Sequence, residues 1–265
     1  MLLFAHLVGI GWDDNRYSLT AMMNGAAHKP FVYRQLVPTL ANIATNGDSA
    51  PSQQRAIAAA IITIFFILYL FAFKWLAATF NVNTILPALA GLPLLMANNN
   101  HIYDLSTLAL FTFAYAALAN KRLILYAALY PLLVLNKETA LLLTLFVFIV
   151  ERNIKLTIYE LTTYAAIRAA LMWLYRDNPG GVIEFHLFTN AVDWILQAQT
   201  SIAYAALIIL LVWRLSITIN HKPAFIRAAL YTLTPTLAVL FFLFGYNYEL
   251  RVFYEVYPIV ALSVL

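Results

Sequence analysis

Acidic and basic side chains stand at the ends of several apolar segments of this chain, where carboxylates could move protons and cations could bind anions. Four connecting loops would bring their carboxylates to one side of the molecule. Their convergence predicts a cavity lined by charge, whereas each residue alone could simply cap a helix or meet water, as Asp104 could before Leu105. These ionisable residues are Asp13, Asp14, His101, Asp104, Lys137, Glu138, Glu249, Arg251 and Glu255.

The pair Lys137 and Glu138 is the sharpest case. It interrupts an apolar run over residues 123–150 in which Asn136 is the only turn residue beside it. The pair marks either a tight hairpin or an ionic group in a cavity. A hairpin alone would not require a charged pair.

The composition excludes several classes of protein. Hydrophobic residues make up 63% of the 265 residues and charged residues 11%, whereas soluble domains carry about 25% charged residues. Lipid must therefore be the solvent for much of the surface. The net charge is +4, but the basic residues are scattered, so we expect no nucleic-acid partner. Without cysteine, disulfides and thiolate chemistry are excluded.

Ten apolar segments predict an all-α fold, a polytopic transmembrane helical bundle formed as a single domain over residues 1–265. Four consecutive segments between residues 84 and 150 have only 12 to 15 residues, too few to cross a hydrocarbon core of about 30 Å upright. We expect short or broken helices there, packed inside protein. The segments are 1–12, 57–80, 84–97, 105–119, 123–135, 139–150, 156–175, 202–218, 225–245 and 252–265.

The loops alternate sides if every segment crosses, and their charges then orient the chain. The positive-inside rule makes the more basic side cytoplasmic. Loops 13–55 and 176–201 fall outside, together with the ionisable residues above, and residues 182–199 could form an extracytoplasmic helix on the membrane surface. The cytoplasmic basic residues are Lys74, Lys121, Arg122, Arg152, Lys155, Arg214, Lys222 and Arg227.

Metal and aromatic patterns are weak. Histidines are dispersed and no metal-ligand spacing occurs, so we predict no metal site. An aromatic group near the C-terminal end indicates an interfacial belt or, alternatively, a stacking platform for a sugar or isoprenoid. Its members are Tyr246, Tyr248, Phe253, Tyr254 and Tyr257.

Several short stretches together resemble the C-type superfamily of membrane glycosyltransferases and related uncharacterised bacterial multispanning proteins. Each stretch is short, and together they extend over most of the chain. They are Asp13-Asp14, residues 29–38 (KPFVYRQLVP), residues 103–105 (YDL), residues 136–141 (NKETAL), and residues 248–253 (YELRVF) with Glu255 and Pro258.

The resemblance implies a transferase that takes a sugar from a polyprenyl-phosphate carrier on the extracytoplasmic face, in a multi-pass protein of the bacterial inner membrane. It implies that Asp13 or Asp14 is the catalytic base or a metal partner. Cations would neutralise the departing phosphate. The cofactor stays open, a divalent cation included. The substrate-binding residues would be Arg34, His101, Asp104, Lys137, Glu138, Glu249, Arg251 and Glu255.

Departures from that superfamily leave other functions open. Its members are usually longer, and the apolar segments at both ends of this chain are short, as in a fragment or a relative that has lost catalysis. The alternative is a non-catalytic integral subunit of a larger membrane complex, with other membrane proteins as partners. A transporter or flippase is third, because no internal repeat is visible.

Overall fold

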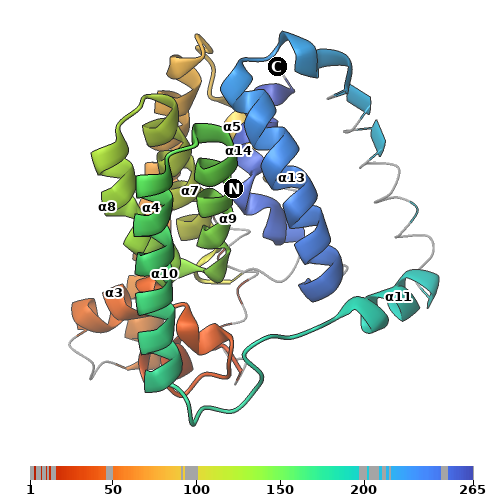
Figure 1. The fold of residues 1–265 in the computed structure, drawn as a ribbon. Helices are drawn as coiled ribbons and strands as arrows, with labels where there is room; N and C mark the ends of the chain where they lie inside the picture. The colour runs from red at the N-terminus through yellow and green to blue at the C-terminus, as the bar shows by residue number, and fades with distance from the viewer. Residues whose placement is uncertain are drawn as a thin grey trace.

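The protein is described here from a computed structural model, which places residues 3, 7, 10, 12, 16–45, 50–90, 92, 101–196, 202, 209–210, 213–214, 216–245 and 250–264. Within these residues every regular element is a helix (Figure 1). The predicted all-α class is therefore confirmed.

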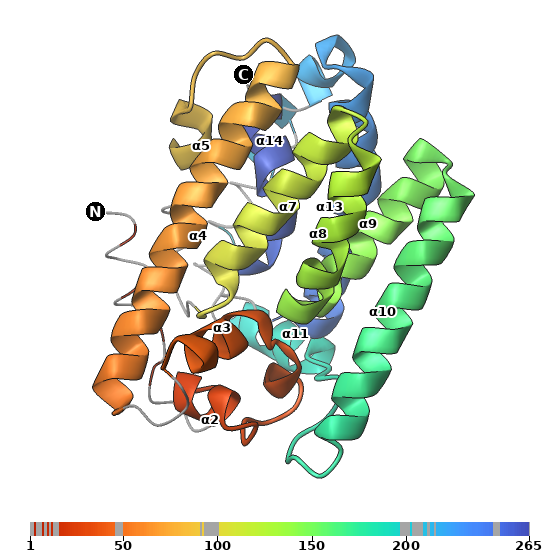
Figure 2. The same ribbon diagram turned by 90° about the vertical axis from the view of Figure 1, so that its left-hand side faces the viewer.

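One end of the bundle is covered by an end layer, which we define as residues 16–45. It contains α2 (Leu19–Met23), the 3₁₀ turn η1 (Phe31–Tyr33) and α3 (Leu36–Thr45), seen at the bottom of Figure 2. The Ser18 hydroxyl caps α2 by accepting a hydrogen bond from the Ala21 amide at 3.3 Å. The layer packs on α4 and on α8, so it closes this end of the helices.

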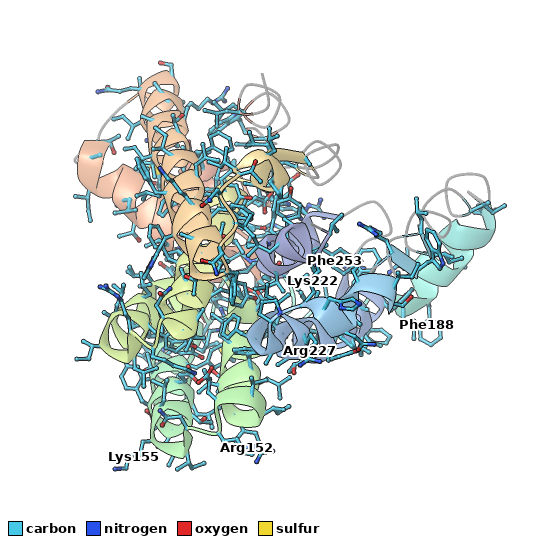
Figure 3. The ribbon with its side chains drawn as sticks, turned by 90° about the horizontal axis from the view of Figure 1, so that it is seen from above. Arg152, Lys155, Phe188, Lys222, Arg227 and Phe253 are labelled. Carbon is cyan, nitrogen blue, oxygen red and sulfur yellow. The ribbon has the colours of Figure 1, made fainter. Side chains whose placement is uncertain are left out.

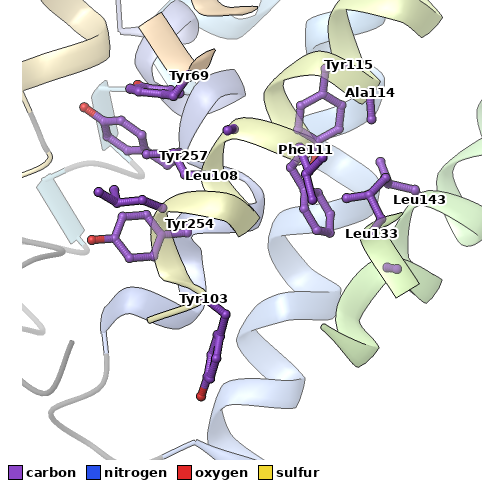
Figure 4. Packing of buried hydrophobic residues seen from close by; sticks show 14 of the residues in the cluster. Tyr69, Tyr103, Leu108, Phe111, Ala114, Tyr115, Leu133, Leu143, Tyr254 and Tyr257 are labelled. Carbon is purple, nitrogen blue, oxygen red and sulfur yellow. The ribbon is translucent and has the colours of Figure 1, made fainter. Parts of the chain in front are cut away.

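Helix α7 (Asp104–Ala119) forms the centre of the bundle. All but two of its 16 residues are buried, which is unusual for a helix with lipid as its solvent. It packs against α4 (Pro51–Thr79) on one side and α8 (Leu123–Asn136) on the other. Phe111 and Tyr115 of α7 point towards Leu133 and Leu143 (Figure 4). Protein therefore surrounds α7.

The predicted short helices after α7 are confirmed. Following α8, the chain forms the 3₁₀ turn η2 (Glu138–Ala140), α9 (Leu141–Phe146) and a π-helical turn, η3 (Val147–Glu151), before α10 (Ile154–Leu174). Arg152, at the end of η3, adopts a left-handed conformation with φ of 50°. The turn reverses the chain so that α10 packs back along α8 and α9.

The C-terminal helices complete the bundle beside α7. They are α13 (Ala224–Phe244), which packs on α9, and α14 (Tyr257–Ser263), which packs on α5 (Leu86–Ala90). The 3₁₀ turns η4 (Ile219–His221) and η5 (Leu250–Glu255) precede α13 and α14. Of the expected segment 84–97, residues 91 and 93–97 lie outside the described residues.

The expected aromatic belt is wrong for two of its members. Tyr254 is 0% exposed and Tyr257 is 8% exposed, and both belong to the core (Figure 4). The Tyr257 hydroxyl donates to the carbonyl oxygen of Pro87 at 2.9 Å. Tyr257 therefore joins α14 to α5. Tyr246 and Tyr248 lie outside the described residues.

Two helices, α4 and α13, are long and apolar enough to cross a membrane by length and composition. In each, only 33% of the most apolar window is buried inside the protein, so most of that surface is available to lipid. The shorter apolar helices α3, α7 and α8 have 10 to 17 residues each. Membrane association is thus supported by these two helices, and a larger number of crossings remains a proposal.

Residues 182–199 were expected to form a surface helix, and α11 (Leu187–Leu196) occupies part of that range. It projects away from the bundle in Figures 1 and 3. The Asn190 side chain anchors it to the end of α13 by donating to the Gly245 carbonyl oxygen at 2.6 Å.

The loops predicted on opposite sides of a membrane lie at opposite ends of the bundle. At one end Lys121 pairs with Glu151 at 2.5 Å. Arg152, Lys155 at the start of α10, and Lys222 lie at this same end, which faces the viewer in Figure 3. The end layer covers the other end.

A set of hydrogen bonds, the end clasp, ties residues 25–29 of the end layer to residues 176–180 after α10. The Asn178 amide donates to the carbonyl oxygens of Gly25 and Ala27 at 2.7 and 2.8 Å, and the Lys29 amide donates to Pro179 O at 2.8 Å. Gly180 has φ of +92°, and a Cβ there would lie 2.5 Å from the Lys29 carbonyl oxygen. Glycine is thus required for this close approach.

Single cysteines at the two ends test the arrangement, because the chain has no cysteine of its own. The side chain of Asp177 is 90% exposed beside the clasp and that of Lys121 is 67% exposed at the opposite end. In intact bacterial cells stripped of their outer envelope, an impermeant maleimide should label Asp177→Cys. It should label Lys121→Cys only after permeabilisation. Labelling of both variants from one side would contradict the arrangement, and the cysteine-free chain is the blank.

Candidate functional site

Arg34 is the end-layer member of a charge cluster that lies where the end layer meets the helices. It follows η1, and its guanidinium holds Glu138 through two contacts, from Nη2 to Oε1 at 2.5 Å and from Nε to Oε2 at 3.2 Å. It also donates to the hydroxyl of Tyr103 and lies 4.6 Å from the centroid of that ring. This two-point pairing fixes the guanidinium plane.

Lys137 and Glu255 form the second pair. Lys137 Nζ lies 2.7 Å from Glu255 Oε1, and the two side chains are 7% and 1% exposed. The Thr139 hydroxyl donates to the same carboxylate oxygen at 2.7 Å, and the Tyr115 hydroxyl donates to the backbone carbonyl of Glu255 at 2.6 Å. Helices α7, α8 and the start of α14 therefore meet at Glu255.

Asp104 and Arg251 form the third pair, with Arg251 Nη1 3.3 Å from Asp104 Oδ1 and side chains 5% and 1% exposed. The other carboxylate oxygen of Asp104 accepts the backbone N–H of His101 at 2.7 Å. The simple helix-cap alternative is therefore wrong for Asp104: Tyr103 occupies the N-cap position, and the Asp104 carboxylate binds the preceding loop and Arg251.

The three pairs form one charge cluster, which we define as Arg34, Asp104, Lys137, Glu138, Arg251 and Glu255. Lys137 and Glu138 are adjacent and bind different partners, so the ionic alternative for this interruption is realised. His101 stacks on Tyr103 with ring centroids 5.1 Å apart, which brings it to the same place. The predicted convergence of these residues is thus seen, and their role in binding a substrate remains a prediction.

Asn136 connects the cluster to the start of α7. Its amide donates to the Thr107 hydroxyl at 2.7 Å, and its carbonyl oxygen accepts from the Ser106 hydroxyl at 2.5 Å. Asn136 is 1% exposed. It therefore acts as a structural link that sets where Lys137 leaves α8.

Three sequence candidates cannot be placed against this cluster. Asp13, Asp14 and Glu249 lie outside the described residues. The proposed catalytic base is therefore assigned by the resemblance alone.

Two ionisable residues of α10 were missed as candidates. The guanidinium of Arg168 lies 4.8 Å from the centroid of the Tyr33 ring. Tyr33 is the residue that precedes Arg34. Glu160 is fully buried, beside the hydroxyl groups of Tyr126 and Thr144. An ionisable residue inside an apolar segment was the signal that could have found both.

The cluster is electrically balanced, since its three cations face three carboxylates at the distances above. No group of three or more metal-ligating side chains gathers among the residues that the structure places. The arrangement can therefore hold hydrogen-bond donors in fixed positions, and the cofactor stays open.

The environment of Glu138 favours its ionised form. Burial alone would raise the pKa of this carboxyl, but the positive charge of Arg34 and the hydrogen bonds from its guanidinium outweigh burial. They lower the pKa from 4.5 to about 2. Glu138 therefore remains ionised at neutral pH.

A shallow hollow of about 370 Å³ lies away from this cluster, at the opposite end of the bundle. It is lined by Phe148, Ile149, Arg152 and Ile154. These are mostly apolar side chains at the η3 turn, and they bring no group suited to transfer chemistry.

Comparison of the chain with protein-family models, with curated proteins and with solved structures gave no match. The resemblance to membrane glycosyltransferases is consequently a hypothesis that rests on the short stretches alone.

Removing the cation of the second pair should be costly. In Lys137→Ala, the Glu255 carboxylate would stay buried without its cation, which typically costs about 3–5 kcal/mol. We expect a loss of this order in the free energy of unfolding, measured by denaturant titration in detergent. Adding Glu255→Gln to Lys137→Ala should recover part of it.

Lys121→Ala is the matched control, because Lys121 pairs with Glu151 at 2.5 Å while its side chain is 67% exposed. Exposed pairs contribute about 0–1 kcal/mol. Equal losses of unfolding free energy in Lys121→Ala and Lys137→Ala would contradict the prediction that the buried pair costs more to break than the exposed one.

The lowered pKa of Glu138 predicts an acid dependence of stability. The stabilising contribution of a carboxyl with a depressed pKa is complete above its unfolded pKa, near 4.5, and is lost as pH falls towards about 2. The midpoint of thermal unfolding should therefore be higher for wild type than for Glu138→Gln at pH 7. The two midpoints should converge as the pH falls from 4.5 to 2. A constant separation over that range would argue against the pairing with Arg34.

Proposed function

We propose that the chain is a membrane-embedded transferase that moves a sugar from a polyprenyl-phosphate carrier to an acceptor at the end of the bundle that holds the charge cluster. One observation supports this most: six acidic and basic side chains from four segments are paired together at the ends of apolar helices, and all but Glu138 are buried. Apolar packing often stabilises a fold as well as buried ion pairs do. Charged residues inside a membrane protein therefore indicate a functional site by default.

In the proposed reaction, the bond between the sugar's anomeric carbon and the carrier phosphate oxygen breaks, and the phosphate leaves with the electron pair. The acceptor oxygen bonds to the anomeric carbon and gives its proton to a carboxylate, which the resemblance assigns to Asp13 or Asp14. Arg34, Lys137 and Arg251 would stabilise the departing phosphate by exchanging a carboxylate for it.

The proposed setting is the bacterial inner membrane, with the chain crossing it several times and the charge cluster on the extracytoplasmic side. The outer surfaces of the long helices fit this setting. Ile64 and Phe71 of α4 are 55% and 64% exposed, and Val239 of α13 is 57% exposed. Lipid would cover these side chains and could deliver a polyprenyl-phosphate to the bundle.

A second candidate is a non-catalytic subunit of a larger membrane complex, and α11 favours it. This helix stands apart from the bundle in Figure 3, and its residues Phe188, Val192 and Leu196 are 77%, 55% and 76% exposed. An apolar face of this kind is suited to another membrane protein or to the bilayer surface.

The purified chain should transfer radiolabelled sugar from a panel of polyprenyl-phosphate sugars to a polyprenyl-linked acceptor. Either Asp13→Asn or Asp14→Asn should lower the rate by about 10²–10⁴-fold, the usual contribution of a general base. The midpoint of thermal unfolding should stay unchanged in that variant. Asp177→Asn, an exposed change at the same end of the bundle, should retain the full rate.

Two results would count against the transferase. One is the absence of transfer across the donor panel by folded protein. The other is an equal rate in wild type, Asp13→Asn and Asp14→Asn. Stable co-purification of other membrane proteins with an inactive chain would instead favour the subunit.

A further inference from the structure

Arg168 stands next to the charge cluster but outside its pairs. It lies on α10, about four turns after the helix begins, and its guanidinium covers the ring of Tyr33 at 4.8 Å. Tyr33 is 1% exposed and immediately precedes Arg34. Tyr164, one turn before Arg168 on the same helix, is within electrostatic range of both Arg168 and Glu138. The cation therefore faces the side of the cluster formed by Arg34 and Glu138.

The guanidinium of Arg168 lacks an acidic partner among the residues that the structure places. Its Nη1 is buried and donates to no acceptor there. The carboxylate of Glu138 already holds the Nε and Nη2 atoms of Arg34. A buried N–H group without an acceptor is rare and calls for a partner that the chain itself does not provide.

Charge counting indicates the sign of that partner. Three cations and three carboxylates cancel within the cluster, so among the residues that the structure places Arg168 adds one further positive charge beside it. A guanidinium presents a planar fork of N–H donors that matches phosphate oxygens, and tyrosine hydroxyls can add further donors. The chemistry therefore fits a phosphate group.

The surface around Arg168 indicates that the phosphate is carried by a lipid. On the outer face of α10, Leu161 is 47% exposed, and Trp173 and Leu174 are 69% and 60% exposed. These apolar side chains flank the turn that carries Arg168. An acyl or isoprenoid chain could lie along them while its phosphate reaches the guanidinium.

We infer that Arg168, together with Tyr33 and Tyr164, binds the phosphate group of a membrane lipid beside the charge cluster. The phosphate oxygens accept from the buried N–H group, and the lipid chain leaves along the outer face of α10. The role of this lipid as a sugar donor rests on the proposed function, since a carrier phosphate held here would place its sugar against the cluster. It assigns the binding role to a residue outside the balanced pairs.

Equilibrium binding of radiolabelled farnesyl phosphate to the full chain in a nonionic detergent tests the site. Arg168→Gln should raise the Kd by about 10- to 100-fold, the range expected for losing charge-assisted hydrogen bonds. Arg168→Lys keeps the charge but lacks the fork, so it should bind with intermediate affinity. Lys155→Gln is the matched control, because Lys155 is an exposed cation at the opposite end of the same helix, and its Kd should equal that of wild type.

Farnesol and inorganic phosphate test the contributions of the isoprenoid chain and of the phosphate group separately. Farnesol should bind more weakly than farnesyl phosphate, with an affinity that does not depend on Arg168. Inorganic phosphate should compete only at far higher concentration than farnesyl phosphate. Equal competition would overturn the lipid source, and an unchanged Kd in Arg168→Gln would overturn the site. If Arg168→Gln unfolds, the binding of Arg168→Lys relative to wild type decides.

The sugar-transfer assay keeps this inference distinct from the proposed function. Binding of farnesyl phosphate that depends on Arg168, in a chain without transfer, would retain the lipid-phosphate site and reject the transferase. Transfer at the wild-type rate by Arg168→Gln would reject the site and retain the transferase.

Discussion

The buried ion pairs constrain the whole bundle, because ionised groups removed from water are tolerated only when they meet a partner of opposite charge. Arg34 belongs to the end layer, Glu138 to the turn after α8, and Glu255 to the turn before α14. None of these segments can shift far without leaving a charge unpaired. The short helices α8 and α9 consequently end where they do, and α7 is enclosed by neighbours whose ends are held together at Asp104 and Glu255.

Much of the helical arrangement could be predicted from the sequence, because apolar length and charge placement are local properties. The shortness of the segments between residues 84 and 150 corresponds to α5, α7, α8 and α9. The gathering of His101, Asp104, Lys137 and Glu255 could also be predicted, since ionisable groups at the ends of apolar helices avoid lipid by facing one another. The number of membrane crossings could not, because α7 is apolar yet buried in protein.

The specific pairs depend on packing between distant segments and left no local pattern. Nothing in the sequence around Lys137 and Glu138 indicates that the first binds Glu255 and the second binds Arg34. Arg168 was missed for the same reason, since its place beside Tyr33 follows from the way α10 packs on η1. For the aromatic residues the prediction was wrong in the opposite sense, because it placed buried side chains at the membrane surface. Tyr254 and Tyr257 are the residue type of an interfacial belt, but both are buried in the core, where Tyr257 bonds to α5.

The end clasp has a mechanical consequence for the two arginines nearest the candidate site. Asn178 and Lys29 join the end layer to the segment after α10 through backbone acceptors, and Gly180 allows the two backbones to approach this closely. This clasp therefore ties the end layer, which carries Arg34, to the helix that carries Arg168. A ligand that displaced the end layer would separate Arg34 from Glu138 and Tyr103, while the clasp would still hold the layer to the end of α10.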